Sequence, residues 1–340
     1  MPFDTQYMRL ALELARSAVG KSNPNPPVGA VVVQNDKIVG KGFTSPAGGA
    51  HAEVNALAEA GVLARGADLW VTLEPCSHFG RTPPCTLAIQ NAGIKRVFYS
   101  YPDPNPIVNS KTKAILEASQ IEVFENILIE ESSFFYKAYA HFVRNKRCFI
   151  ELKVAQTQDG FIAGPHKQRL AITKSKANQW TNRLRAYSDA ILIGGGTLEI
   201  DKPSLSLRGE KGNAPQRIFL VGSRLLSPHL EVFKSNDKVI VYSYVKQPAI
   251  QDSCDFRLLQ SRSFSENWSQ IIQELSKEGV HRLMVEPGAM LSKLILETNL
   301  WDQLHVWVSP TSIQDGTPWA FKVQVPYSNE DQLISIENFL

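Results

Sequence analysis

The residues with the clearest chemical potential are a histidine, a glutamate and two cysteines. His51-Ala52-Glu53 is followed by Cys76, and eight further residues separate Cys76 from Cys85. One neutral imidazole and two thiolates supply three ligands for a tetrahedral Zn2+ ion and leave the fourth position to water. Because zinc lowers the pKa of a bound water to about 7, hydroxide would form at neutral pH. The spacing therefore predicts a catalytic zinc site with His51, Cys76 and Cys85 as ligands.

Glu53 lies two residues after the expected ligand His51, where it can reach a metal-bound water without binding the metal. Its carboxylate can then take a proton from the water and pass it to departing ammonia. Two alternatives are a structural zinc site with His78 as a fourth ligand, and two buried cysteines beside an incidental histidine. A carboxylate placed beside an open position favours catalysis.

The elements that position these residues follow from hydrophobic periodicity and turn residues. His51 opens a predicted helix over 51–61, and Cys85 lies in the first turn of another over 84–92. A helix N-terminus favours a thiolate over a thiol. A hairpin is expected across Asn35-Asp36, between strands at 28–33 and 37–43. Further strands are expected at 67–73, 96–101 and 121–125, and further helices near the N-terminus and at 111–119 and 130–144.

The alternation of strands and helices begins again after a short basic stretch, Arg144 to Arg147. We therefore predict two α/β domains, residues 1–145 and 146–340, in which helices cover the faces of a sheet. The second domain is expected to contain strands at 149–156, 189–193, 217–221, 238–244, 282–286 and 303–309, and helices at 174–187, 265–277 and 289–297.

Composition excludes several classes of protein. The chain has 340 residues, of which 43% are hydrophobic, and a formal net charge of +3 without a block of basic residues. Such a charge argues against nucleic acid as a partner, and no apolar run is long enough to span a membrane. Four cysteines are too few for a disulfide framework, and the N-terminus lacks the pattern of a secretory signal. We therefore expect a globular cytoplasmic protein.

Three motifs carry a resemblance to a known family: EPCSHFGRTPPC at 74–85, PNPPVG at 24–29 and DPNP at 103–106. The pattern H-x-E…P-C…C is that of the cytidine-deaminase superfamily, and the eight residues between the cysteines narrow the choice. The chain resembles the bifunctional deaminase/reductase of riboflavin biosynthesis. The resemblance implies a cytidine-deaminase-like domain followed by a dihydrofolate-reductase-like domain. The implied small-molecule substrate is 2,5-diamino-6-(5-phosphoribosylamino)pyrimidin-4(3H)-one, deaminated to 5-amino-6-(5-phosphoribosylamino)uracil.

The same resemblance implies a substrate pocket around the zinc site. Asn25 offers a donor and an acceptor to a pyrimidine edge, and Arg81 can form a paired contact with a phosphate. The residues that match the family's pocket are Asn25, His78, Arg81, Asp103 and Asn105. For Asn25, Asp103 and Asn105, turn formation beside prolines is an equally good explanation. Thr44 stands where the family commonly has histidine.

In the second half, the resemblance implies an NADPH-dependent reduction of the ribosyl group to ribityl. Lys153, Asp201 and Arg208 are then expected to contact the substrate, with Lys153 and Arg208 suited to its phosphate. Backbone amides at Gly194–Thr197 can approach cofactor phosphates, although an ordinary turn at a strand end would explain these glycines equally well. The expected cofactor-binding residues are Ala155, Thr157, Thr173, Gly194, Gly196, Thr197, Glu286 and Gly288.

Three departures from the family pattern leave an alternative open. Ala171 replaces a usual tryptophan, Pro287 a glycine, and Thr311 a lysine. Proline lacks an N–H group, so Pro287 removes a potential phosphate donor, although proline fits the first position of a helix. The alternative is a deaminase with a silent reductase domain. A zinc-stabilised binding module is a third hypothesis, and the resemblance also suggests a homo-oligomer.

Overall fold

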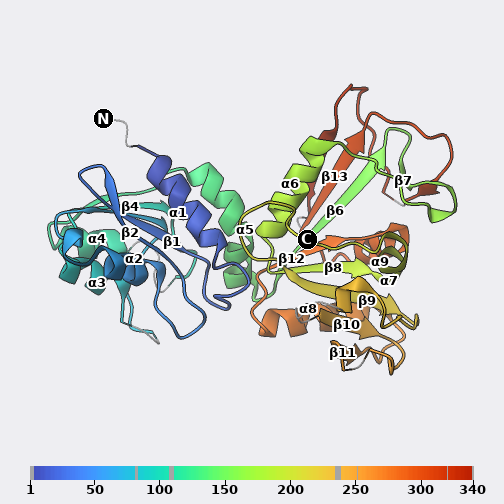
Figure 1. Cartoon of the computed structure of the whole chain (residues 1–340), viewed down its shortest axis with the longest axis horizontal. Coiled ribbons are helices and arrows are strands. Elements are labelled where there is room, and N and C mark those ends of the chain that lie inside the picture. The colour runs from blue at the N-terminus through green and yellow to red at the C-terminus, as the bar shows by residue number, and fades with distance from the viewer. Residues whose placement is uncertain are drawn as a thin grey trace. The chain divides into compact units, whose positions relative to one another are not determined.

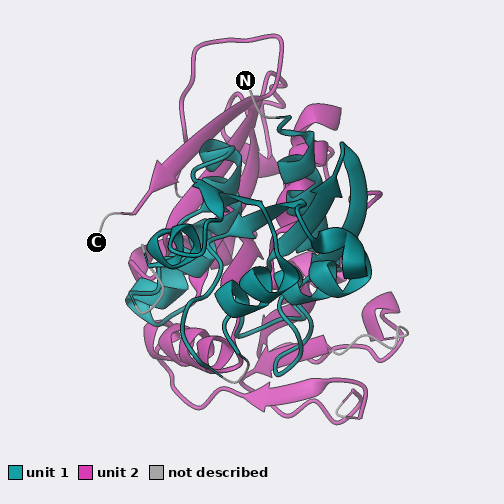
Figure 2. Cartoon of the chain, turned by 90° about the vertical axis from the view of Figure 1, so that its left-hand side faces the viewer, with its two compact units in different colours: residues 1–147, 211–213 teal, residues 148–210, 214–340 magenta. Residues whose placement is uncertain are grey.

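The computed structural model describes residues 4–80, 83–106, 111–233, 239–250, 252–319 and 321–338. The chain forms two compact units, shown in different colours in Figure 2. The first comprises residues 1–147 and the second residues 148–340, except that the short segment 211–213 belongs to the first unit. Within the described ranges, no helix is long and apolar enough to cross a membrane.

The first unit is built on a five-stranded sheet with the order β2-β1-β3-β4-β5 (Figure 1). Strand β1 is antiparallel to β2 and β3, whereas β3, β4 and β5 are parallel to one another. The strands are β1 (Gly29–Gln34), β2 (Lys37–Phe43), β3 (Asp68–Leu73), β4 (Arg96–Tyr101) and β5 (Glu122–Phe124). The predicted β1–β2 hairpin is confirmed. Asn35 and Asp36 have left-handed φ angles of 50° and 59°, as two-residue hairpin turns require.

Helices cover both faces of this sheet. They are α1 (Gln6–Arg16), α2 (Ala52–Ala60), α3 (Cys85–Ala92), α4 (Thr112–Glu117) and α5 (Ile129–Asn145), with a 3-10 turn η1 (Gly61–Ala64) after α2. A Cβ atom at Gly29 would lie 1.9 Å from the Ala11 carbonyl oxygen of α1. On the other face, a Cβ atom at Gly42 would lie 2.3 Å from the Ala52 carbonyl oxygen of α2. Glycine in β2 thus lets α2, the helix that follows His51, lie directly on the sheet.

The second unit contains an eight-stranded sheet with the order β11-β10-β9-β8-β12-β6-β13-β15. All neighbouring strands are parallel except β13 and β15. The strands are β6 (Phe149–Thr157), β8 (Ala190–Gly194), β9 (Gln216–Gly222), β10 (Val239–Ser243), β11 (Asp255–Leu258), β12 (Arg282–Glu286), β13 (Gln303–Ser309) and β15 (Gln332–Glu337). A separate pair is formed by β7 (Phe161–Ala163) and β14 (Thr317–Pro318).

The helices of the second unit are α6 (Ser175–Ala186), α7 (Gly195–Asp201), α8 (Phe264–Lys277) and α9 (Ala289–Glu297), with 3-10 turns η2 (Pro165–Lys167) and η3 (Glu231–Phe233). Apolar side chains of α8 and α9, including Trp268 and Ile295, pack with Ile150 and Leu152 of β6. The sequence predicted every helix here except α7. Two glycines begin α7, and glycine has a low helix propensity.

The opposite face of this sheet buries charged residues beneath α6. The Glu151 carboxylate lies 2.6 Å from Arg282 Nη1 and 2.6 Å from His305 Nε2, and all three side chains are at most 3% exposed. The Trp180 ring of α6 packs edge-on against His305, with 4.8 Å between ring centroids. Paired and enclosed in this way, the charges avoid the cost of an unpartnered ion in the core.

Candidate active sites

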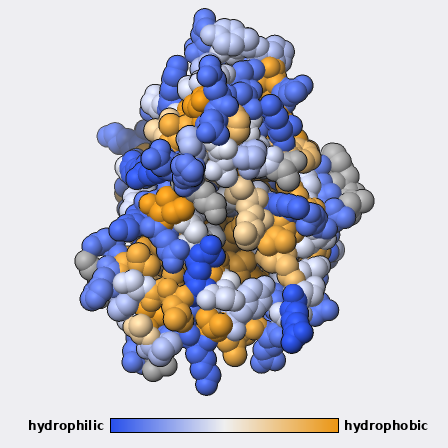
Figure 3. All heavy atoms as spheres, turned by 90° about the vertical axis from the view of Figure 1, so that its right-hand side faces the viewer, coloured by the Kyte–Doolittle hydropathy of each residue, from blue (hydrophilic) through white to orange (hydrophobic). Residues whose placement is uncertain are grey.

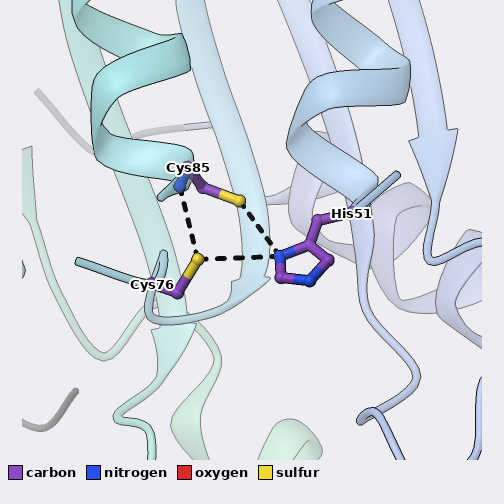
Figure 4. Close-up of side chains that lie close together, drawn as sticks. All are labelled: His51, Cys76 and Cys85. Carbon is purple, nitrogen blue, oxygen red and sulfur yellow. Dashed lines mark hydrogen bonds between the residues drawn. The ribbon is translucent and has the colours of Figure 1, made fainter. Parts of the chain in front are cut away.

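The expected zinc ligands lie at the ends of three neighbouring elements (Figure 4). His51 is the N-cap residue of α2, Cys76 follows β3 in a loop, and Cys85 is the first residue of α3. Glu53 lies in the first turn of α2 and is only 4% exposed. These four residues, which come from the segment 51–85, thus lie together at one end of the sheet.

The ligand atoms have the separation that tetrahedral zinc requires. His51 Nδ1 lies 3.3 Å from Cys85 Sγ and 3.6 Å from Cys76 Sγ. Bond lengths of about 2.0 Å to nitrogen and 2.3 Å to sulfur place two tetrahedral ligands about 3.6 Å apart. All three atoms lie within 4.8 Å of one another, and this is the one such group among the described residues. The imidazole therefore presents Nδ1, rather than Nε2, to the metal position.

The site favours the negative charge that zinc binding needs. The Cys85 thiol and His51 donate hydrogen bonds to the Cys76 sulfur, and its pKa falls to about 4. The Cys85 backbone N–H, at the start of α3, adds a further hydrogen bond of 3.3 Å to the same sulfur. The contact with Cys76 raises the pKa of Cys85, as does burial. Metal ions deprotonate their cysteine ligands, so zinc binding would convert both residues to thiolates.

Glu53 is buried beside the expected metal ligands, and this environment shifts its pKa upward. Burial, followed by the negative charge of Cys76, raises its pKa to about 7, while His51 opposes the shift. A general acid or base works best when its pKa lies near the operating pH. The carboxyl group is therefore suited to carry a proton during a reaction at this centre.

The expected pocket residues fall on three loops. Asn25 is half-buried in the loop before β1, and its backbone N–H donates to the Ser22 carbonyl at 2.9 Å. Asp103 follows β4 and is 6% exposed, and burial together with the charges of Glu74 and Cys76 raises its pKa to about 6. This electrostatic contact places Asp103 near the zinc site.

Asn105 and His78 are the other expected substrate residues that the structure describes. The Asn105 backbone N–H donates to Asp103 Oδ1 at 2.9 Å, which closes a turn. His78 is half-buried, and its buried Nδ1 atom has no hydrogen-bond partner among the residues that the structure describes. A buried nitrogen of this kind is satisfied when a polar ligand occupies the pocket. Arg81 lies outside the described residues.

Sequence reasoning missed the buried polar residues that hold these loops, above all Tyr136 of α5 and Glu74. The Tyr136 hydroxyl donates to the Pro27 carbonyl at 2.9 Å and lies 2.6 Å from Thr72 Oγ1, which in turn accepts the Gly29 N–H at 3.1 Å. Thr44, whose replacement of histidine we noted, is 3% exposed and accepts the Val28 N–H at 3.0 Å. Only a structure reveals such contacts, because each joins segments that are distant in sequence.

In the second unit, the structure brings most of the expected cofactor residues together. Strands β8 and β12 are parallel neighbours, and each leads into a helix whose N-cap is a glycine, Gly194 before α7 and Gly288 before α9. A Cβ atom at Gly288 would lie 3.3 Å from Thr197 Oγ1, so the two helix starts are adjacent. The N–H groups at adjacent helix N-termini suit a phosphate. The side of the molecule on which α7 and α9 are labelled in Figure 1 is hollowed, with apolar side chains around the hollow (Figure 3).

Pro287 affects this region less than its sequence position suggests. Gly288 is the N-cap of α9 and Ala289 its first residue, so Pro287 precedes the helix instead of occupying its first position. The first-turn N–H groups of α9, which begin at Ala289, are therefore all present. Pro287 still lacks an N–H group of its own, but that group would lie before the helix and outside its first turn. Thr311 is also outside the sheet, and its N–H donates to Ser309 Oγ at 3.3 Å.

The expected substrate residues Lys153 and Asp201 lie near Glu286. Burial lowers the pKa of Lys153, and the charge of Glu286 opposes that shift. Burial raises the pKa of the half-buried Asp201, and the charge of Glu286 adds to the effect. Glu286 itself is held by Arg185, whose Nη2 lies 2.7 Å from its carboxylate. Arg208 is exposed and has a left-handed φ of 47°.

The remaining expected cofactor residues lie along β6 and before α6. Ala155 is half-buried on β6, two residues after Lys153. Thr157 is fully buried, and its hydroxyl lies 2.5 Å from Asp159 Oδ1 within the turn that leads to β7. Thr173 precedes α6 and donates to Asn178 Oδ1 at 3.5 Å. The Thr157 hydroxyl is thus engaged within the protein, whereas Ala155 faces the same side of the sheet as Lys153.

Two protein-family models match the chain, one in each unit. The model for the cytidine and deoxycytidylate deaminase zinc-binding region matches residues 1–101. The model for the RibD C-terminal domain matches residues 148–322. The fold and the ligand geometry of the first unit are therefore those of a zinc-dependent deaminase, joined to a reductase domain.

Full-length relatives identify the family. The chain is 36% identical to the riboflavin biosynthesis protein RibD of Aquifex aeolicus, over 92% of this chain and 88% of the relative. It is 32% identical to the Escherichia coli protein of the same name, over 90% and 88% of the two chains. The chain belongs to the RibD family of riboflavin biosynthesis proteins, which combine a deaminase and a reductase.

Two solved structures are similar to this chain over almost its whole length. The Thermotoga maritima diaminohydroxyphosphoribosylaminopyrimidine deaminase/5-amino-6-(5-phosphoribosylamino)uracil reductase gives a TM-score of 0.77 at 32% identity. The alignment covers 98% of this chain and 97% of the other. A crystal form of Acinetobacter baumannii RibD gives a TM-score of 0.74 at 30% identity and covers 97% of both chains.

Proposed function

We propose that this chain catalyses the two successive reactions for which its Thermotoga relative is named. In the first, water attacks the ring carbon that bears the 2-amino group of 2,5-diamino-6-(5-phosphoribosylamino)pyrimidin-4(3H)-one. A carbon–oxygen bond forms, the carbon–nitrogen bond breaks, and ammonia leaves with the formation of 5-amino-6-(5-phosphoribosylamino)uracil. In the second, hydride from NADPH and a proton reduce the ribosyl group of that product to ribityl.

The observation that carries the first reaction is the His51, Cys76 and Cys85 cluster with the buried Glu53 beside it. A zinc ion held by these three residues would supply an activated water. Glu53 accepts a proton from that water and delivers it to the departing nitrogen, a role that its raised pKa supports. Asn25, His78, Asp103 and Asn105 orient the pyrimidine and ribose by hydrogen bonds, and Arg81 binds the phosphate.

The carboxyl ends of β8 and β12 support the second reaction. Gly194, Gly196, Thr197 and Gly288 present backbone groups to the cofactor phosphates, as their adjacent helix starts suggest. We assign Lys153, Asp201 and Arg208 to the substrate. Glu286, which Arg185 fixes in place, is assigned to the cofactor together with these glycines. The remaining cofactor contacts are assigned to Ala155, Thr157 and Thr173.

One incubation tests both assignments. Purified, zinc-loaded protein is given the diaminopyrimidine phosphate and NADPH, and the products are identified by mass spectrometry. Exchange of the amino group for oxygen, followed by the gain of two hydrogens, is the expected result. Deamination that stops at the uracil would leave the second unit without the proposed activity. No turnover by folded, zinc-loaded protein would rule out the proposed substrate.

We also propose a cell compartment, a class of substrate and an oligomeric state for this protein. We place the protein in the cytoplasm, where reducing conditions keep Cys76 and Cys85 available to zinc. The net charge of +3 supports a small-molecule substrate over nucleic acid. We also propose a homo-oligomer, which light scattering coupled to size-exclusion chromatography would test by the mass of the particle.

A further inference from the structure

Glu74 is a buried carboxylate that the reactions above do not use. It directly follows β3, is 3% exposed, and lies two residues before Cys76. Its position mirrors that of Glu53, which lies two residues after His51. Each carboxylate is thus separated from one expected metal ligand by a single residue. The contacts of the two side chains must explain how their roles differ.

The contacts of Glu74 are with the backbone of two other segments. Its Oε2 atom accepts the backbone N–H of Asp103 at 3.2 Å, and its Oε1 atom accepts the backbone N–H of Thr112 at 3.4 Å. Thr112 Oγ1 in turn donates to the Pro75 carbonyl at 2.6 Å. One buried carboxylate thus joins the loop that carries Cys76, the segment after β4 and the start of α4. Both of its oxygens are engaged by backbone donors.

The segment held in this way is the one that carries two expected pocket residues. Asp103 Oδ1 accepts the Asn105 N–H at 2.9 Å and lies 3.5 Å from the Tyr139 hydroxyl. The turn from Asp103 to Asn105 is therefore built upon a backbone position that Glu74 fixes. Because Glu74 and Cys76 are separated by one residue, the same contact sets the distance of that turn from the metal ligands.

We propose that Glu74 is a positioning residue, which fixes Asp103 and Asn105 against the zinc site so that they can bind the deaminase substrate. The inference rests on the proposed function, in which those two residues contact the substrate. It requires a carboxylate, because a glutamine would turn an N–H group toward one of the two backbone donors. A buried donor left without an acceptor is unfavourable, and the segment would then shift away from its place.

Glu74→Gln tests the proposal in the full, zinc-loaded chain. We expect the KM of deamination to rise about tenfold or more, the effect of losing a hydrogen bond to a charged group. The zinc content and the reductase rate with the uracil substrate stay unchanged, and kcat falls by no more than about threefold. Glu59→Gln is the matched control, because Glu59 also accepts a backbone N–H, that of Lys41 at 3.0 Å, and should leave KM unchanged. An unchanged KM in Glu74→Gln, or a loss of zinc, would overturn the proposal.

A double variant shows whether Glu74 acts through Asp103. If it does, Glu74→Gln adds little to the KM of Asp103→Asn, whereas independent effects multiply and contradict the proposal. Hydrogen exchange of the Asp103 and Thr112 amides gives a measure that needs no activity, and Glu74→Gln should accelerate both. If the wild-type chain fails to deaminate the substrate, the proposed function is wrong. If Glu74→Gln leaves the exchange rates of the Asp103 and Thr112 amides unchanged, Glu74 is not the residue that positions this segment.

A milder variant keeps the proposal testable if Glu74→Gln does not fold. Thr112→Val removes the hydrogen bond to the Pro75 carbonyl and leaves the Glu74 carboxylate in place. The connection between the same segments is then weakened, and we expect a smaller rise in the KM of deamination. A KM equal to that of the wild type would count against the positioning role.

Discussion

The two sites of this molecule are assembled in opposite ways. In the first unit, the expected metal ligands and the proton carrier come from residues 51–85 and lie at two helix starts and one strand end. In the second unit, the expected residues are spread from Lys153 to Gly288, over β6, the carboxyl ends of β8 and β12, helix α7 and several loops. As proposed, the first site depends on side-chain identity, whereas much of the second depends on backbone N–H groups that almost any residue provides.

The difference explains how each site responds to sequence change. A metal ligand cannot be replaced, because few side chains donate nitrogen or sulfur to zinc. A phosphate site made of helix N-termini can accept Pro287, since that proline precedes the N-cap of α9 and leaves the donors of the helix in place. Departures from a family pattern therefore carry less weight in the second unit than in the first.

Glu53→Gln is expected to have the largest effect, and it separates the activity of the first site from that of the second. The amide cannot relay a proton, so deamination should fall at least about a hundredfold. Reduction of the uracil substrate by the same preparation should be unaffected. Ammonia release and NADPH oxidation measure the two activities separately. Deamination at the wild-type rate would make the zinc site a structural one.

The second largest effect concerns the buried ion pair of the second unit. Glu151→Gln leaves Arg282 without its charged partner in the core and should lower the free energy of unfolding of this unit by about 3–5 kcal/mol. Denaturant unfolding followed by tryptophan fluorescence measures the change, since Trp180 packs against His305. The control is Glu297→Gln, because Glu297 is 59% exposed in its pair with Lys293. Equal stability in both variants would contradict the prediction.

The same carboxylate predicts how the stability of the second unit depends on pH. Burial by itself would raise the pKa of Glu151, but the charge of Arg282 and the hydrogen bond from His305 lower it below its ordinary value. A depressed pKa adds stability above the unfolded value of about 4.3, and this stability is lost as the pH falls through the folded value. Unfolding free energies measured between pH 7 and pH 3 should therefore decline below about pH 4, and less steeply in Glu151→Gln.

The smallest effect is expected at the cofactor site. In Gly288→Val, the new Cβ atom would lie 3.3 Å from Thr197 Oγ1, and its methyl groups would crowd the space between the two helix starts. We expect the KM for NADPH to rise about fivefold, equivalent to ~1 kcal/mol. Deamination measured without NADPH serves as the internal control. An unchanged KM would place the cofactor phosphates elsewhere.

The sequence predicted the features that depend on short stretches of chain. The hairpin across Asn35-Asp36 and the helix starts at His51 and Cys85 each follow from a few neighbouring residues. Helix α7 was missed because it begins with two glycines, and β11 and β15 because neither strand contains a fully buried residue, β11 being short as well. Glu74 and Tyr136 were missed because each contacts the backbone of segments far away in the sequence.

The zinc cluster also has a consequence for the amount of active protein in a cell. An ion bound by His51, Cys76 and Cys85 cross-links three segments of the first unit, and a ligand that binds the folded state stabilises that state by mass action. Scarcity of zinc would then increase the unfolded fraction of the first unit, which proteases degrade. Zinc starvation would thus lower the abundance of the whole chain, and the reductase would be lost together with the deaminase although the zinc ligands all lie in the first unit.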